Sequence, residues 1–212
     1  MKLHYRLSWH IVNSFFKFGL GMKVDGKEYI PPGGGLIVAT NHISFWDPPL
    51  LGAASTRELY YLAKEELFRN VFFRKLIQAF NAVPIGRDRF DRKGLFAVIS
   101  HLKKGRALLV FPEGGRNLSG ELKPARTGIG MMAMETSSPI LPAYISGSDK
   151  IKKALRRKGR VRISFGPPIR TSEFPPVGRA GYRELSAEVM KRIQALKETH
   201  EKTGIIDDTS MK

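Results

Sequence analysis

The sequence predicts a single α/β domain with a central mixed, largely parallel sheet flanked by helices, and an amphipathic helix at its N-terminus. From Gly33 onward, short apolar or β-branched runs of strand length alternate with longer stretches of helical period. The 212 residues, 42% hydrophobic and 26% charged, are enough for one well-buried core and few for two. We therefore expect one sheet with helices packed on it.

The expected elements follow one another in a regular order. Strands are expected over residues 36–40, 59–62, 82–85, 107–111, 140–145 and 161–165. Helices are expected over residues 48–55, 64–80, 92–104, 128–135 and 179–197. Strand and helix alternate, as in proteins built around a parallel sheet. The body of the domain is placed at residues 24–203, and residues 204–212 are expected to form a frayed tail.

Residues 1–23 are predicted to form the amphipathic helix. When residues 4–22 are advanced by about 100° each, polar and apolar side chains separate onto two arcs. The narrow polar arc holds Arg6, His10, Asn13, Ser14 and Lys17. The wide apolar arc holds Trp9, Ile11, Val12, Phe15, Phe16, Phe18, Leu20 and Met22.

A wide apolar arc beside a thin basic stripe is typical of a helix that lies in a membrane interface. A helix packed on its own domain is the alternative. No segment approaches the roughly 20 apolar residues that a spanning helix requires. No small-residue cleavage site follows the apolar run, so we expect the segment to be retained. These features predict a peripheral or monotopic membrane protein that does not cross the bilayer.

The charge is strongly positive. The chain has 36 Lys and Arg against 19 Asp and Glu, a net charge of +17, which implies an anionic partner. Residues 150–162 carry eight of the basic residues and no acidic one. This run could be a solvated face, a contact for anionic lipid or an acidic carrier protein, or a nucleic-acid contact. The chain has no cysteine and its five histidines are scattered, so no thiolate nucleophile and no metal site are expected.

A histidine and an aspartate follow the first predicted strand closely. They lie in residues 41–47 (NHISFWD), at the end of a strand, where α/β proteins build their sites. His42 and Asp47 are the residue types of a general base and its orienting carboxylate. The carboxylate fixes the imidazole tautomer and stabilises the imidazolium that forms when the base takes a proton. In the alternative interpretation, His42 is a loop residue and Asp47 caps a helix whose first position is Pro48.

Two further strand ends carry basic residues. Residues 111–116 (FPEGGR) combine glycine backbone that a ligand can approach with Arg116, whose fork can hold a phosphate through two hydrogen bonds. A tight turn in which Glu113 pairs with Arg116 is the alternative. Residues 83–87 (VPIGR) end in Arg87, and Lys64 lies upstream at a strand-to-helix junction. Basic surface residues are also common at such junctions.

In this order, the motifs resemble those of the glycerolipid acyltransferases, specifically the bacterial lysophosphatidic acid (1-acyl-sn-glycerol-3-phosphate) acyltransferases. NHISFWD is similar to the first motif of that family, and PIGRD with the upstream Lys64 to the second. FPEGGR is similar to the third, usually FPEGTR, and residues 140–144 (ILPAY) with Gly147 to the fourth. The resemblance covers roughly residues 24–197. The departures are Gly115 for Thr, Asn117 for Ser, and Asn81 where a Gly often precedes the second motif.

The resemblance implies the glycerolphosphate acyltransferase fold and an enzyme of phospholipid biosynthesis at the cytoplasmic face of the cell membrane. Such an enzyme moves a fatty-acyl group from an acyl carrier protein or coenzyme A thioester to the free hydroxyl of lysophosphatidic acid, giving phosphatidic acid. His42 would be the general base, oriented by Asp47, without an acyl-enzyme. The residues that would bind substrate are Lys64, Arg87, Glu113, Gly114 and Arg116.

The expected partners are the lysophospholipid acceptor, the acyl donor and an anionic membrane surface, with no nucleic acid, no metal and no cofactor beyond the co-substrate thioester. Two alternatives remain open. The same chemistry could act on glycerol 3-phosphate, another lysophospholipid or an amino lipid. A nonenzymatic protein could instead use the basic excess to bind membranes and make no use of His42 and Asp47.

Overall fold

The computed structural model of this protein describes residues 14, 16, 19, 21–79, 81–86, 92–151, 161–175 and 177–209. Most of the amphipathic helix predicted over residues 1–23 lies outside these ranges, as do Arg87 and residues 152–160 of the basic run. Within the described ranges, no helix combines the length and apolar character needed to cross a membrane.

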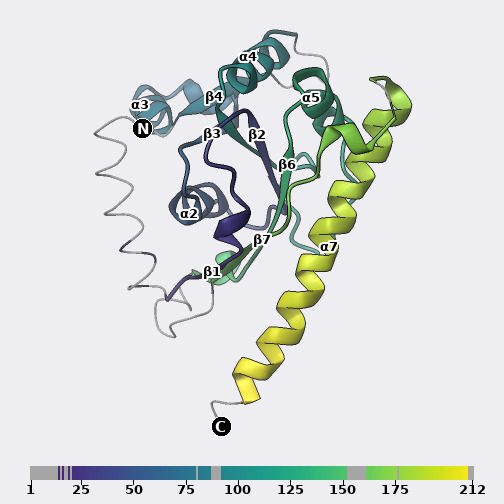
Figure 1. Ribbon diagram of the computed structural model, residues 1–212. Helices are drawn as coiled ribbons and strands as arrows, with labels where there is room; N and C mark the ends of the chain where they lie inside the picture. Colours follow the sequence, from purple (N-terminus) through teal and green to yellow (C-terminus); the bar gives the residue numbers. More distant parts are fainter. Residues whose placement is uncertain are drawn as a thin grey trace.

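Seven strands form one sheet in the order β1-β7-β6-β2-β5-β3-β4 (Figure 1). They are β1 (Lys23–Asp25), β2 (Leu36–Thr40), β3 (Leu59–Lys64), β4 (Ala82–Ile85), β5 (Ala107–Val110), β6 (Ile140–Ser146) and β7 (Arg162–Phe165). Neighbouring strands are parallel except β6 and β7, which are antiparallel. The predicted mixed, largely parallel sheet is confirmed.

Helices cover both faces of the sheet. They are α2 (Asp47–Ala54), α3 (Val71–Ala79), α4 (Arg92–Lys103), α5 (Gly128–Thr136) and α7 (Arg179–Thr209), with short 3-10 turns η2 (Lys27–Tyr29), η3 (Glu65–Phe68), η4 (Ser148–Lys150) and η5 (Thr171–Glu173). Helix α2 packs on one face, whereas α4, α5 and α7 cover the other, as Figure 1 shows.

The central strand β2 contacts both layers because successive side chains of a strand point to opposite faces. Leu36 and Val38 pack in the core beneath α2, while Ile37 and Ala39 pack beneath the other helices. All five residues of β2 are buried. A strand buried on both faces reads as a continuous apolar run, which is how the sequence revealed it.

The structure differs from the expected elements at three places. Strand β1 was not expected, because three residues at the sheet edge are too few to set up a hydrophobic period. The helix expected over residues 64–80 is shorter, because β3 continues to Lys64, where it pairs with Ile85 of β4. Helix α7 continues past residue 197 to Thr209, so most of the tail expected to be frayed is helical. The Lys197–Glu201 pair, 3.8 Å apart, links the expected end of the helix to this extension.

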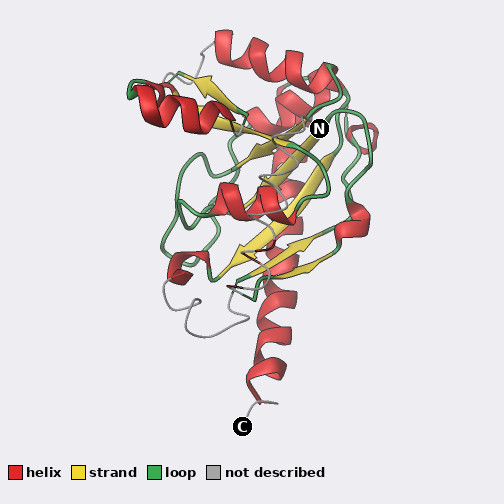
Figure 2. Cartoon of the chain, turned by 90° about the vertical axis from the view of Figure 1, so that its left-hand side faces the viewer, coloured by secondary structure: helices red, strands yellow, loops and turns green. Residues whose placement is uncertain are grey.

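The sheet topology brings separate loops to one edge. Strands β6, β2 and β5 are adjacent and parallel, so the segments after Ser146, Thr40 and Val110 leave the same side of the sheet. Figure 2 shows the yellow strands between red helices, with green loops connecting the two. We refer to this side, where the five parallel strands end, as the carboxyl edge.

Candidate active site

His42 and Asp47 are joined directly at the carboxyl edge. Nδ1 of His42 lies 2.7 Å from Oδ2 of Asp47, whose side chain is fully buried, whereas 15% of the His42 side chain is exposed. An ionised carboxylate only accepts hydrogen bonds, so Nδ1 carries the proton and Nε2 of the neutral ring is an acceptor. This is the tautomer that a general base needs.

The Asp47 carboxylate is held by three further donors. Its Oδ2 accepts hydrogen bonds from the backbone N–H groups of Ile43 and Ser44, both at 2.8 Å. Its Oδ1 accepts from Oγ of Ser148, a fully buried residue of η4, at 2.5 Å. The hydrogen bonds to backbone amides go to the loop before α2, so the interpretation of Asp47 as a helix cap is not supported. Ser148 was not predicted as a site residue.

Asn41 ties the first motif to the next strand. Its Nδ2 donates to the carbonyl of Ile145 and its Oδ1 accepts from the Ile145 N–H, each at 2.9 Å. The Asn41 side chain thus continues the pairing of β2 with β6 beyond Thr40 and Ala143. Because it is buried and both polar atoms are satisfied, it fixes where the loop bearing His42 begins.

Residues 111–117 pack against the first motif through three contacts. The Phe111 ring stacks on His42 with centroids 3.8 Å apart and an interplanar angle of 15°. The backbone N–H of Asn117 donates to the carbonyl of His42 at 2.7 Å. The Arg116 guanidinium carbon lies 3.5 Å from the centroid of the Phe45 ring. The structure therefore brings the predicted base and the predicted anion-binding turn together.

Glu113 shapes this turn. Its Oε2 accepts from Nδ2 of Asn117 at 2.6 Å and from the backbone N–H of Lys123 at 3.1 Å. Within the described part of the chain, Glu113 makes no ion pair with Arg116, so the alternative of a self-paired turn is not supported. The guanidinium of Arg116 is exposed beside Phe45.

Gly114 is required by the turn. It has φ of 80°, and a Cβ on it would lie 2.2 Å from Nε of Arg126. Arg126, whose backbone N–H donates to the carbonyl of Pro112, is a second cation over the FPEGGR segment that sequence reasoning missed. Its only sequence signal was its basic character in the loop between β5 and α5.

The second motif lies on the far side of β5. Lys64 ends β3, the neighbour of β5, so its backbone lies at the carboxyl edge; its side chain and Arg87 are outside the described part of the structure. Asn81, which stands where a Gly often occurs, has φ of 59°. Asparagine tolerates this left-handed conformation better than most residues, which explains the replacement. No group of three potential metal-ligating side chains occurs among the residues described.

Comparison with known sequences identifies the family. The sequence model of the family described as Acyltransferase matches residues 21–146, more than half of the chain. The chain belongs to the acyltransferase family. The match spans both motifs that meet at the carboxyl edge, and the protein is therefore an enzyme that transfers acyl groups.

Several relatives of this acyltransferase have known identities. The chain is 31% identical over 204 residues to the 1-acyl-sn-glycerol-3-phosphate acyltransferase of Borreliella burgdorferi, covering 91% of this chain and 81% of the relative. It is 29% identical over 155 residues to the protein of that name from Bacillus subtilis, covering 73% and 76%. Its fold is similar to the crystal structure of the 1-acyl-sn-glycerophosphate (LPA) acyltransferase PlsC from Thermotoga maritima, with a TM-score of 0.69, 28% identity and coverage of 91% and 81%.

Proposed function

We propose that this acyltransferase moves a fatty-acyl group from an acyl thioester to the free hydroxyl of lysophosphatidic acid, giving phosphatidic acid. The observation that carries the proposal is the His42–Asp47 pair, oriented as a general base beside the arginine-bearing FPEGGR turn. The acceptor is supported by the relatives from Borreliella burgdorferi and Bacillus subtilis, which are named as 1-acyl-sn-glycerol-3-phosphate acyltransferases.

In this mechanism the acceptor hydroxyl is the nucleophile, so no acyl-enzyme forms. Nε2 of His42 removes the hydroxyl proton as the oxygen attacks the thioester carbonyl carbon. The Asp47 carboxylate stabilises the imidazolium that results. When the tetrahedral intermediate collapses, the carbon–sulfur bond breaks and His42 returns its proton to the departing thiolate. Backbone amides near the second motif would stabilise the oxyanion.

The phosphate of the acceptor would be held by cations on neighbouring connections. Arg116 stands exposed beside Phe45, next to the His42 loop, and Arg126 lies over the same turn. Lys64 and Arg87 would add charge from the second motif. Glu113, held by Asn117 and the Lys123 backbone, would position the turn that presents Arg116.

The substrates would meet the enzyme at a membrane. A lysophospholipid acceptor carries a long acyl chain, so we propose that the protein acts as a peripheral or monotopic protein at the cytoplasmic face of the cell membrane, with residues 1–23 in the interface. The donor would be an acyl carrier protein or coenzyme A thioester. Both donors and the anionic membrane surface suit the net charge of +17, and no metal or other cofactor is proposed.

An acceptor panel tests the proposal. Purified full-length protein is given a radiolabelled acyl-coenzyme A or acyl carrier protein thioester with lysophosphatidic acid, glycerol 3-phosphate, other lysophospholipids or an amino lipid. We expect labelled phosphatidic acid from lysophosphatidic acid, read by lipid chromatography. His42→Ala should reduce the rate at least about a hundredfold. His101→Ala is the matched control. His101 lies on α4 and contacts the ring of Tyr60, and its replacement should keep the rate.

Each contrary outcome has a distinct meaning. Labelled product from a different acceptor would contradict lysophosphatidic acid as the substrate while keeping the chemistry. Full activity in a correctly folded His42→Ala protein would contradict the mechanism. Vesicle binding without any labelled lipid would support the nonenzymatic alternative.

A further inference from the structure

Exposed apolar side chains concentrate at the carboxyl edge. Of the nine large apolar side chains exposed in the described ranges, six belong to the connections that leave β2, β5 and β3. We call these six the apolar rim: Phe45, Trp46, Leu67, Val71, Phe72 and Leu118. The most exposed are Phe72 at 87%, Leu118 at 76% and Phe45 at 75%. Apolar surface gathered in one region marks an interaction site, whereas scattered residues do not.

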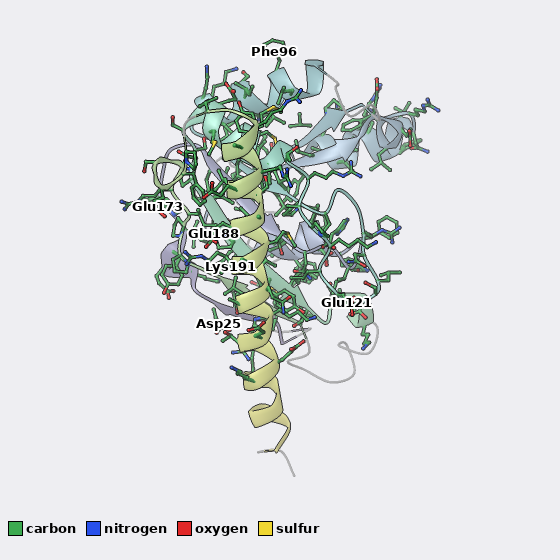
Figure 3. All side chains as sticks on the ribbon, turned by 90° about the vertical axis from the view of Figure 1, so that its right-hand side faces the viewer. Asp25, Phe96, Glu121, Glu173, Glu188 and Lys191 are labelled. Atoms are coloured by element: carbon green, nitrogen blue, oxygen red, sulfur yellow. The ribbon has the colours of Figure 1, made fainter. Side chains whose placement is uncertain are left out.

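The sheet explains why these residues share one side of the molecule. Strands β2, β5 and β3 are adjacent and parallel, so their connections emerge together. Figure 3 shows helix α3, which begins with Val71 and Phe72, on the same side as Glu121 of the β5–α5 loop. Glu173 of η5 lies on the opposite side. The rim therefore follows the edge that carries His42.

Basic residues alternate with the apolar rim. Arg69, Arg74 and Lys75 lie beside Leu67 and Phe72 in the segment after β3. In the loop after β5, Arg116, Lys123 and Arg126 accompany Leu118. Acidic residues are present too, at Glu65, Glu66 and Glu121, so charge alone does not define the surface. Large aromatic and aliphatic side chains interleaved with Lys and Arg match the headgroup region of an anionic bilayer.

One contact and the exposure of one side chain favour a bilayer over an acidic carrier protein. Arg116 stacks on Phe45, so an aromatic ring and a cation are presented together, as at the level of lipid headgroups. Trp46, 47% exposed, is adjacent to the buried Asp47. A carrier protein recognised by charge would not require apolar side chains to project from three separate connections.

We propose that the apolar rim inserts into the headgroup region of an anionic bilayer and holds the His42 site against the membrane. This contact is additional to any made by residues 1–23. It rests on the proposed function for the lipid nature of its acceptor, which then needs to leave the bilayer only partly to reach His42. The rim also accounts for exposed residues that the chemistry does not use, such as Phe72.

Tryptophan fluorescence tests the insertion without any activity. The chain has two Trp residues, Trp9 and Trp46, so the full-length Trp9→Phe variant reports on Trp46 alone. Vesicles of equal parts phosphatidylglycerol and phosphatidylcholine are added, with or without brominated acyl chains. We expect a blue shift of the Trp46 emission and quenching by the brominated lipid. If the protein floats completely with the vesicles while Trp46 is neither shifted nor quenched, the proposal is overturned.

A pair of matched variants tests the consequence for catalysis. Phe72→Asp removes the most exposed rim side chain, whereas Val177→Asp places the same charge at a 60% exposed site beyond η5. Phe72→Asp should weaken vesicle binding about tenfold, because the variant lacks the phenyl group whose transfer from water into the bilayer would stabilise binding. Acylation of lysophosphatidic acid in vesicles should fall in parallel. Val177→Asp should change neither, and thermal unfolding checks that both variants fold.

A soluble acceptor separates the two proposals. With short-chain lysophosphatidic acid below its critical micelle concentration, Phe72→Asp should turn over at the wild-type rate. If wild type fails on this acceptor and on vesicles alike, the proposed function is wrong, while the Trp46 quenching result stands by itself. Equal vesicle binding by Phe72→Asp and wild type would overturn the proposal that the apolar rim inserts into the bilayer. A rate loss confined to the acyl carrier protein donor would assign the surface to that protein and also overturn it.

Discussion

Asp47 and Arg57 are two charged side chains with four hydrogen bonds each, at opposite edges of the same sheet. At the carboxyl edge, Asp47 accepts from two backbone amides, from Nδ1 of His42 and from Oγ of Ser148. Its side chain is fully buried. A carboxylate that accepts four hydrogen bonds is fixed in place.

At the other edge, Arg57 donates to four backbone carbonyls. Nη1 contacts Pro31 at 3.1 Å and Gly33 at 3.3 Å, and Nη2 contacts Gly34 at 2.7 Å and Gly105 at 2.9 Å. These carbonyls belong to the segments that enter β2 and β5. Arg57 thereby joins the beginnings of two strands whose ends carry the site.

The difference between the two networks lies in the partners. Among the described residues, the side-chain partners of Arg57 are backbone carbonyls, which do not exchange a proton, so these contacts stabilise the fold. One partner of Asp47 is a titratable ring that is partly exposed, so the same kind of saturation supports proton transfer at Nε2. The Asp47 network can therefore serve proton transfer because one of its four partners is His42. Substitutions at the two networks should therefore have different effects on stability and on catalysis.

The largest effect is expected for Asp47→Asn. The four groups around Asp47 are hydrogen-bond donors, so the NH2 group of an asparagine would face donors in place of an acceptor. The Nδ1–H tautomer of His42 would then no longer be fixed, and kcat should fall at least about a hundredfold. Steady-state kinetics with lysophosphatidic acid measures this. Asp25→Asn is the matched control, because Asp25 pairs with Arg162 at an exposed position and should affect kcat little. Similar kcat values for the two variants would contradict the assignment.

Arg57→Met should produce the reverse pattern. Loss of the guanidinium removes four charged hydrogen bonds, partly replaced by water, so the free energy of unfolding should fall by about 2 kcal/mol. Urea denaturation measures this, and kcat of the folded fraction should stay near that of wild type. Arg57→Lys keeps the charge but lacks the planar guanidinium that reaches several carbonyls. Its free energy of unfolding should lie between those of wild type and Arg57→Met. A large loss of kcat at unchanged stability would show that the Arg57 network, at the edge where the strands begin, influences the active site.

His200 sharpens the comparison with His42. Its Nε2 contacts Oγ of Ser164, and its Nδ1 lies 3.4 Å from Oγ of Ser146, so its partners are hydroxyls and not a carboxylate. Burial, reinforced by Arg162 and opposed by Asp25, lowers the pKa of His200 from 6.5 to about 4. The folded protein therefore holds this ring neutral.

The unfolded chain binds a proton at His200 near pH 6.5, whereas the folded chain does so only near pH 4. This contribution to stability is full above pH 6.5 and is lost as the pH falls toward 4, with a slope of at most about 1.4 kcal/mol per pH unit. Urea denaturation at several pH values should show a shallower decline in His200→Gln than in wild type. Parallel declines would mean that His200 is protonated equally in both states.

The smallest effect is expected for Ser148→Ala. One donor of four is lost from Asp47, so His42 is less well oriented and kcat should fall about tenfold with little change in KM. Ser148→Thr keeps the hydroxyl and should restore much of the rate. Ser146→Ala, whose hydroxyl faces His200, is the control. An unchanged kcat in Ser148→Ala would mean that the two amides and His42 suffice to hold Asp47.

Much of the fold could be predicted because its signals are local. A buried strand such as β2 is a continuous apolar run, and helices such as α4 follow the 3.6-residue period. The pairing of His42 with Asp47 also follows from a short segment. The short edge strand β1 and the extension of β3 to Lys64 depend on partners far along the chain, so no local pattern marked them.

The sequence by itself determined the fold class, the order of the motifs at strand ends, and the histidine and aspartate that lie together. The tertiary structure decided which strand ends are neighbours, because the order β6-β2-β5-β3 is not the order of the chain. Only that arrangement carries Ser148 to a carboxylate 101 residues away and the Asn117 amide to the carbonyl of His42. It also gathers the apolar rim on the side of the site. Propensity and periodicity act over a few residues, whereas these contacts depend on how the whole sheet is assembled.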